Sequence, residues 1–285
     1  MKFLFCGSGA SEGIPALFCS CEICGKARSR GGKEMRSRTA YQFGESVRID
    51  FGPDLFGQQN RYGLRLDRLE HLFITHSHKD HFTPLNFIYR RPQYVPLEKT
   101  LYLHAGEDII EQTEKVLKEN GSDFAECLIT PVESVFFRSE EIDAEGEKMT
   151  VTPLPSDHLP AGKTRIYEIA YREKRVLVGT DSGIYPNETW NYFKGRHYDL
   201  AVMDATSGIL GLRQVHMGRE CLVETVKRLR QMGVYDDCTL VIANHFSHNG
   251  KMNHDDLEAY YGPRNIHVGF DGLEIDFSGH GRLVL

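Results

Sequence analysis

The residues with the clearest chemical potential lie within one hexapeptide. Residues 76–81 read His-Ser-His-Lys-Asp-His, so four side chains able to bind a metal follow directly after an apolar run. Imidazole suits zinc, iron and manganese, and a carboxylate oxygen widens the choice toward manganese. A mixed nitrogen and oxygen ligand set is typical of catalytic sites, because closed structural zinc sites are usually rich in thiolates. We therefore predict a catalytic metal centre containing His76, His78, Asp80 and His81.

Three further segments place ligand-type side chains just after strand-like runs. His158, Asp181 and His245 each lie within four residues of the end of such a run. Side chains at strand ends are held by a rigid scaffold while staying open to solvent. A centre with two metals needs more ligands than one hexapeptide supplies, and these three residues are the candidates to complete it.

A second group of potential ligands consists of thiols. Cys19, Cys21 and Cys24 place three thiols within six residues. Three thiolates and one imidazole make a closed tetrahedral zinc site, and His248, three residues after His245, is the candidate fourth ligand. The chain has seven cysteines, an odd number, and without a secretion signal we expect no disulfide framework.

The elements that must position these residues come mostly as runs of strands. Strand-like segments lie at 2–6, 39–43, 46–51, 72–75, 149–154, 165–171, 175–179, 200–203, 239–243, 265–268 and 273–277. Helical spacing of apolar residues occurs at 107–119 and 218–232. Strands in runs with few helices between them favour an α/β fold of two sheets packed face to face with helices outside. We see no domain boundary and expect one domain over residues 1–285, with a zinc loop at about 19–24.

Composition and charge narrow the classes of function. The 285 residues carry a net charge of −6, whereas sequence-independent nucleic-acid binding needs a basic surface. No stretch approaches the length of a membrane span, and the apolar run at the N-terminus is too short for a signal-peptide core. We therefore expect a cytoplasmic protein with neither membrane nor nucleic acid as a partner.

The order of these motifs resembles the metallo-β-lactamase superfamily. The pattern is His-x-His-x-Asp-His, then a lone His, a Gly-Thr-Asp and a late His, and it extends over nearly the whole chain. The resemblance implies an αββα sandwich of two mixed sheets with outer helices, and it implies that Asp50 braces the metal loop. It also implies two metals with these ligands: His76, His78 and His158 for one, Asp80, His81 and His245 for the other, and Asp181 as the bridge. A bridging aspartate is typical of the phosphodiesterase branch.

One subgroup resembles the chain more closely. Residues 7–15, the Cys-x-Cys-x-x-Cys cluster, the late His-x-x-His and the ending at 268–275 resemble the phosphoribosyl cyclic-phosphate phosphodiesterases of the carbon–phosphorus lyase pathway. This resemblance implies a homodimer and a structural zinc that pins the N-terminal loop to the loop of His245. Its implied ligands are Cys19, Cys21, Cys24 and His248.

The chain also departs from that subgroup. It carries extra residues around 90–100 and 134–147, and insertions near a site change substrates more readily than chemistry. A related group in quinone-cofactor biosynthesis has a similar cysteine cluster, but the intact His-x-His-x-Asp-His speaks for hydrolysis.

The expected reaction is attack of a dimetal-bound hydroxide on a small cyclic phosphate, with zinc, manganese or iron as the metal. Asp80 is expected to orient the hydroxide while binding metal. The leaving alkoxide needs a proton, and His216, just before the helical segment 218–232, matches a non-ligand histidine of the subgroup. Four basic residues are candidates to bind phosphate: Arg90, Arg91, Lys163 and Arg213.

Two other functions fit part of the pattern. Endonucleases that process tRNA 3′ ends share the motifs, but they usually carry a protruding arm rich in Gly and basic residues, and no such arm is evident in the sequence. A metal-stabilised binding or sensor protein would bind metal tightly and hydrolyse no phosphodiester. The complete ligand set argues against that reading.

Overall fold

The apolar runs of the sequence form the strands of two sheets. The first sheet contains β1 (Lys2–Gly7), β2 (Ala40–Phe43), β3 (Val47–Ile49), β4 (His71–Phe73), β5 (Leu101–Ala105), β6 (Ile129–Glu133) and β14 (Glu274–Asp276). The second contains β7 (Glu140–Ala144), β8 (Glu147–Pro155), β9 (Arg165–Tyr171), β10 (Lys174–Gly179), β11 (Leu200–Asp204), β12 (Leu240–Asn244) and β13 (His267–Val268). The α-helices are α1 (Glu22–Arg30), α2 (Leu55–Tyr62), α3 (Glu107–Glu119), α4 (Asn187–Phe193), α5 (Arg219–Gln231) and α6 (His254–Tyr261).

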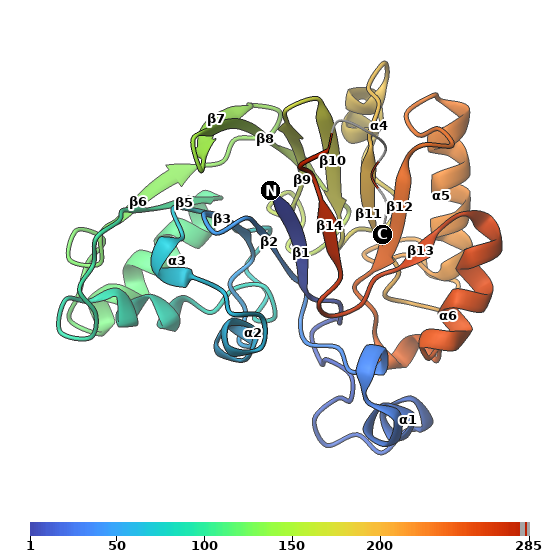
Figure 1. Cartoon of the computed structure of the whole chain (residues 1–285), viewed down its shortest axis with the longest axis horizontal. Helices are drawn as coiled ribbons and strands as arrows, with labels where there is room; N and C mark the ends of the chain where they lie inside the picture. The colour runs from blue at the N-terminus through green and yellow to red at the C-terminus, as the bar shows by residue number, and fades with distance from the viewer. Residues whose placement is uncertain (280–282, 284–285) are drawn as a thin grey trace.

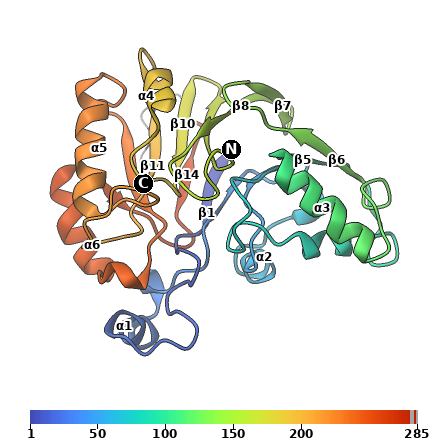
Figure 2. The same ribbon diagram turned by 180° about the vertical axis from the view of Figure 1, so that it is seen from behind.

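This computed structural model describes residues 1–279 and 283. Helices α2 and α3 lie on one side of the paired sheets, and α4, α5 and α6 lie on the other (Figure 1). The structure therefore confirms the αββα sandwich of two mixed sheets. Helix α1 lies apart from both sheets, below the end of β1, in the two opposite views (Figure 1, Figure 2).

Strand direction decides where the loops of the site gather. The first sheet has the order β14-β1-β2-β3-β4-β5-β6 and the second has the order β13-β12-β11-β10-β9-β8-β7. Pairing is antiparallel from β14 to β3 and parallel from β3 to β6. In the second sheet it is antiparallel from β7 to β10 and parallel from β10 to β13. The carboxyl ends of β10, β11 and β12 therefore meet at one edge.

A core rich in aromatic side chains holds the two sheets together. Phe3 and Phe43 of the first sheet are fully buried and stack with ring centroids 4.1 Å apart. They belong to one apolar cluster with Val176 and Val202 of the second sheet. Separate apolar clusters fill the spaces between each sheet and its helices. These outer clusters pack the helices against the two sheets whose strand ends carry the site.

The strand that precedes the ligand cluster at 76–81 ends earlier than the sequence pattern predicts, because a side chain takes up a backbone hydrogen bond. The predicted strand 72–75 is β4, which ends at Phe73, because the amide of Thr75 donates to the carboxylate of Asp50 instead of continuing the ladder. The predicted strand 46–51 likewise ends at Ile49, because Asp50 has a positive φ of 68°.

Several elements gave no clear sequence pattern. Helices α1, α2, α4 and α6 are 7 to 9 residues long, and each buries only two or three side chains, so their helical period is weak. The segment 134–147, predicted as an insertion, contains β7, which pairs with β8 at the edge of the second sheet. Within the described residues no helix has the length and apolar character needed to cross a bilayer.

The packing between the sheets makes a prediction about stability. Phe43→Ala removes a fully buried ring that stacks on Phe3, so it should lower the free energy of unfolding by about 3–5 kcal/mol. Chemical denaturation measures this loss. Phe56→Ala is the matched control, because Phe56 is 74% exposed on α2 and its loss should change stability by less than about 0.5 kcal/mol. Equal losses in the two variants would contradict the assigned core.

Candidate metal centre

The predicted metal ligands gather at the carboxyl ends of strands from both sheets. β4 of the first sheet leads into residues 76–81. In the second sheet, β8, β10 and β12 lead to His158, Asp181 and His245. The ligand atoms of these seven side chains fall into overlapping groups in which every pair lies within 4.8 Å. Loops from both sheets therefore build one site.

Three imidazoles form the first cluster. The Nε2 atom of His76 lies 3.0 Å from Nδ1 of His78, and Nε2 of His158 lies 3.1 Å from that same atom. Zinc–nitrogen bonds of about 2.0–2.1 Å put neighbouring ligand nitrogens roughly 3.0–3.4 Å apart. The three nitrogens therefore have the spacing that one metal ion requires. His76 and His158 are buried, whereas His78 is exposed.

A second cluster consists of Asp80, His81 and His245, all buried. The Oδ2 atom of Asp80 lies 3.1 Å from Nε2 of His81 and 3.8 Å from Nε2 of His245. Two nitrogens and one oxygen thus converge at a second position beside the first.

Asp181 lies between the two clusters. Its Oδ2 atom is 3.0 Å from Nε2 of His81 and 3.1 Å from Nε2 of His245. Its Oδ1 atom is 3.7 Å from Nε2 of His158 in the first cluster. One oxygen of the carboxylate therefore faces each cluster, as a bridging ligand requires.

Asp50 and Thr75 fix the orientation of two of these imidazoles. The Asp50 carboxylate accepts hydrogen bonds of 2.9 Å from the amide and the hydroxyl of Thr75. It also lies 2.6 Å from Nδ1 of His81, and the Thr75 hydroxyl lies 2.9 Å from Nδ1 of His76. Because Nδ1 of each ring is engaged outside the cluster, Nε2 is left to face inward.

The other two buried imidazoles are oriented in the same way. Nδ1 of His158 donates to the carbonyl oxygen of Val215 at 3.0 Å. Nδ1 of His245 lies 2.8 Å from the Thr206 hydroxyl, which donates in turn to Asp204 at 3.0 Å. All four buried rings thus present Nε2 to the centre.

The unsatisfied atoms at the centre fit a metal. Nε2 of His81, Nε2 of His245 and Oδ2 of Asp181 are buried without any hydrogen-bond partner, a costly state unless a cation lies between them. Burial opposes the charged form of Asp181, yet His245 and His81 hold its pKa well below its usual range. Burial likewise opposes the charge on His81, and the carboxylates around it raise its pKa. A buried carboxylate surrounded by imidazole nitrogens is a donor set suited to zinc, iron or manganese.

Asp204, the last residue of β11, is a buried carboxylate of this site that the sequence analysis missed. It accepts hydrogen bonds from the amide of Met217 at 2.9 Å and from the Thr206 hydroxyl. Its Oδ2 atom lies 3.1 Å from Nδ1 of His216. The signal was present, because Asp204 directly follows the predicted strand 200–203, just as the other candidate ligands follow theirs.

His216 lies beside the clusters without joining either set of three. Its ring centroid is 4.8 Å from that of His158 and 5.7 Å from that of His245. Burial disfavours its charged form, but the adjacent carboxylate of Asp204 raises the pKa of His216 to about 9. With Nδ1 held by Asp204, the ring is fixed in orientation where it lines the cavity above the metal ligands.

The thiols converge with His248 as the sequence suggested. The Sγ atoms of Cys19 and Cys21 each lie 3.4 Å from Nδ1 of His248, and Cys24 completes a group whose ligand atoms all lie within 4.8 Å. Zinc–sulfur bonds of about 2.3 Å with a zinc–nitrogen bond of about 2.0 Å put sulfur and nitrogen roughly 3.5 Å apart in a tetrahedron. The four residues therefore have the spacing of a closed zinc site.

Helix α1 explains how two of these thiols are held. Cys21 is the N-cap of α1, and the backbone amide of Cys24 lowers the pKa of Cys21 to about 6. Burial raises the pKa of Cys24 to about 11, and the neighbouring thiols of Cys21 and Cys19 act in the same direction. A metal ion bound by this cluster would favour the thiolate form of its cysteines.

Three of the four basic residues considered for phosphate binding have other partners in the structure. Arg90 donates to the carbonyl oxygens of Cys127 and Lys99, and Arg91 donates to that of Asn120. Arg213 forms an ion pair with Glu224 on α5, and Lys163 does not line the cavity at the metal ligands. The structure therefore assigns Arg90 and Arg91 to bracing of the chain between β4 and β6.

Comparison with known proteins places the fold. The family model for the beta-lactamase superfamily domain matches residues 46–235, two thirds of the chain. The chain belongs to the beta-lactamase superfamily.

Three solved structures illustrate the similarity of fold. A diphosphatase of the PhnP family aligns with 97% of this chain and 98% of its own, at a TM-score of 0.72 and 23% identity. Zn²⁺-bound PqqB from Methylobacterium extorquens aligns with 97% of this chain and 100% of its own, at a TM-score of 0.73 and 17% identity. The short form of human tRNase Z aligns with 98% and 100%, at a TM-score of 0.65 and 14% identity. At these identities the likeness concerns the fold.

One curated relative is longer than this chain. An octanoyltransferase of Porphyromonas gingivalis is 23% identical over 96% of this chain, and the match spans 51% of that relative. The chain thus corresponds to about half of that protein.

The thiol cluster makes a prediction about metal content. Cys21→Ser should lower zinc content by about one ion per chain, since it removes one of four ligands, and should lower the thermal midpoint. Elemental analysis of the purified protein and calorimetry measure the two effects. Cys238→Ser is the matched control, because Cys238 is exposed and lies outside the cluster. An unchanged zinc content in Cys21→Ser would contradict a zinc site at the thiol cluster.

Proposed function

We propose that this protein is a metal-dependent hydrolase that cleaves a small phosphodiester, with a cyclic phosphate as the favoured class. The observation that carries the proposal is the placement of Asp181, with one carboxylate oxygen toward each of two ligand clusters. Two divalent cations bound there would generate a water-derived nucleophile at neutral pH and neutralise charge on a phosphoryl group. Membership of the beta-lactamase superfamily supports a hydrolase.

The proposed ligand sets follow the two clusters. His76, His78 and His158 form the first set, Asp80, His81 and His245 form the second, and Asp181 is shared. The buried hydrogen bonds to Asp50, Thr75, Val215 and Thr206 hold the rings in place before any metal binds, so little reorganisation is needed. Asp80 is both a proposed ligand and a cavity-lining acceptor, which suits it to orient a water molecule.

His216 is the proposed general acid. The Asp204 carboxylate accepts a hydrogen bond from Nδ1 of His216 and favours the imidazolium form of the ring, so Nε2 also carries a proton that is available to the leaving alkoxide of a substrate in the cavity. Asp204 thereby plays a positioning role like that of the acid that orients histidine in a catalytic triad.

The proposed zinc of the thiol cluster has a structural role. His248 follows His245 by three residues, and Ala10 of the N-terminal loop donates its amide to the carbonyl oxygen of Phe246. A zinc at Cys19, Cys21, Cys24 and His248 would join the N-terminal loop to the loop after β12 at a second point. The backbone of His245 would then be held by β12 before it and by the zinc ligand His248 after it.

The metal dependence of the proposed activity can be measured directly. We expect the purified protein to hydrolyse bis(p-nitrophenyl) phosphate, to lose at least about 90% of that rate on chelation, and to recover it with added manganese or zinc. Release of p-nitrophenolate is the readout. A sample with full metal content and no hydrolysis of any phosphodiester would refute the proposal and favour a binding protein. Salt-dependent affinity for tRNA would instead favour the nuclease reading.

The role of His216 is tested by substitution. His216→Ala should lower kcat for a diester with a poor alkyl leaving group by about 10²–10⁴-fold while metal content is unchanged, because general acid catalysis is lost. The loss should be much smaller for bis(p-nitrophenyl) phosphate, whose leaving group needs no proton. His197→Ala is the matched control, since His197 is half-exposed and pairs with Asp236. Equal losses with both substrates would remove His216 from the proton-transfer role.

A further inference from the structure

The cavity at the metal ligands is lined by two chemically different kinds of side chain. Its volume is about 390 Å³, which suits a small molecule. Residues of the two metal clusters and His216 are among the lining residues. Leu159, Leu210 and Leu212 also line the cavity, although their exposed fractions are 54%, 38% and 49%. Three partly exposed leucines in the lining of a polar site leave apolar surface open to a molecule that enters the cavity.

The charge of the cavity walls is also uneven. Among the described residues that line it, none is Lys or Arg. Glu12, from the loop after β1, is the lining acid that lies outside the two metal clusters. Its Oε1 atom accepts hydrogen bonds from the Ser247 hydroxyl and, at 3.2 Å, from the Asn249 side chain. Oε1 also lies 3.5 Å from Nε2 of His248, so the carboxylate is held at the wall.

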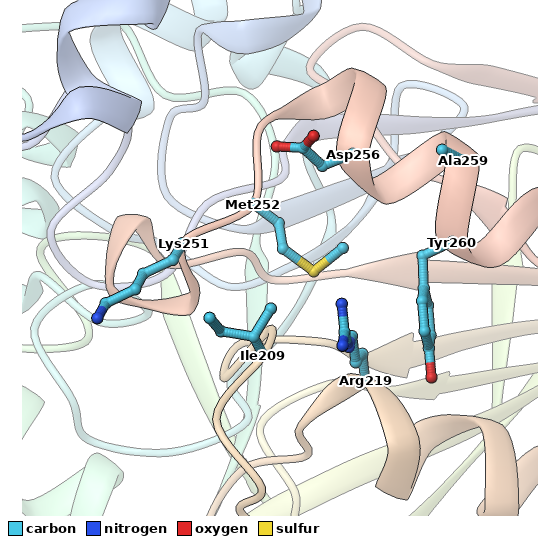
Figure 3. A pocket seen from close by; sticks show the side chains of 7 residues that line it. All are labelled: Ile209, Arg219, Lys251, Met252, Asp256, Ala259 and Tyr260. Carbon is cyan, nitrogen blue, oxygen red and sulfur yellow. The ribbon is translucent and has the colours of Figure 1, made fainter.

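Basic side chains near this region line a different cavity. Arg219 and Lys251 line a hollow of about 470 Å³, where Arg219 stacks on Tyr260 at 4.5 Å (Figure 3). The Lys251 ammonium points away from the Arg219 guanidinium in that view. Ile209 lines this hollow and Gly250 lines the cavity at the metal ligands. The amide of Ile209 donates a hydrogen bond of 3.0 Å to the carbonyl oxygen of Gly250, so the two hollows are neighbours.

From this arrangement we propose the substrate class of the site, resting on the proposed phosphodiesterase function. The substrate has one phosphodiester, and the part that extends from it is an uncharged apolar group that contacts Leu159, Leu210 and Leu212. A second phosphate is disfavoured, because beyond the metal ligands and His216 it would meet Glu12, and no Lys or Arg is among the described residues that line the cavity. A ribose cyclic phosphate with an additional phosphate group therefore fits this cavity poorly.

The physical reasons act in the same direction. Covering half-exposed leucines with an alkyl or aryl group removes apolar surface of both partners from water. A phosphate dianion near a fixed carboxylate in a partly enclosed site is repelled more strongly than it would be in bulk water. Glu12 thus disfavours substrates that carry a second phosphate, whereas the leucines favour substrates that carry an apolar group.

Product-like phosphate monoesters test the proposal without requiring turnover. Calorimetric titration of the metal-loaded protein would compare methyl phosphate, hexyl phosphate and 1,6-hexanediol bisphosphate. We expect hexyl phosphate to bind at least about 10-fold more tightly than methyl phosphate, since several methylenes lose contact with water. The bisphosphate has the same chain length and should bind more weakly than hexyl phosphate by a similar factor.

Matched variants assign the two effects to residues. Leu212→Ser should reduce the preference for hexyl over methyl phosphate several-fold. Leu85→Ser is the control, because Leu85 is 50% exposed and lies outside the cavity. Glu12→Gln should narrow the gap between hexyl phosphate and the bisphosphate.

Equal binding of methyl and hexyl phosphate, tighter binding of the bisphosphate, or no binding of any of the three would overturn the proposal. So would an unchanged preference in Leu212→Ser together with an unchanged gap in Glu12→Gln. These outcomes are distinct from failure of the proposed function. In that case the binding series would hold, but the metal-loaded protein would hydrolyse no phosphodiester.

Discussion

The site depends on one buried negative charge. Asp181 is 3% exposed, and its carboxylate lies within 3.0–3.7 Å of imidazole nitrogens from three different loops. A carboxylate taken out of water is costly unless cations or hydrogen-bond donors compensate it. Protein donors are missing at its Oδ2 atom, so the loops around it are arranged for a positive ion. The surrounding rings meet this need for a positive ion, because their Nδ1 atoms are engaged outside the centre and their Nε2 atoms face inward.

Backbone strain at the same place indicates what the scaffold must supply. Asp50, Asp181 and His245 all adopt positive φ values, between 55° and 68°. Each such residue costs of order 1 kcal/mol or more, and it persists only where the surrounding structure fixes it. Here each follows a strand of a sheet that is packed on both faces. The rigid sheets therefore stabilise turns that aim the three side chains at a single point.

The sequence allowed much of this to be predicted, and the failures have physical causes. The strand at 165–171 and the helix at 107–119 coincide with β9 and α3, because continuous apolar patterns report burial directly. The seven proposed ligands stood out since each follows a strand, and the structure brings them together, although their role stays a prediction. Asp204 escaped notice because its importance comes from His216 and Thr206, which approach it only after folding.

Properties of the cavity were beyond reach of the sequence for a related reason. Leu159, Leu210 and Leu212 are ordinary loop residues in the chain, and only the folded structure shows that they line the same cavity. Arg90 shows the converse, because a basic residue that suggested phosphate binding proves to brace backbone carbonyls. Local patterns report burial and ligand type, whereas partners across the fold depend on topology.

The origin of the ligands in distant parts of the chain has a consequence for biosynthesis. The thiols at 19–24 and the cluster at 76–81 leave the ribosome before His245 and His248, which follow more than 160 residues later. Until β12 has been made, every ligand set except the three histidines of the first cluster is incomplete. The nascent chain must therefore reach the last part of its second sheet before a bridged pair of metals or a closed thiol site can form. Completion of the second ligand cluster and of the thiol site therefore comes after synthesis of β12, whereas the three histidines of the first cluster are all present earlier.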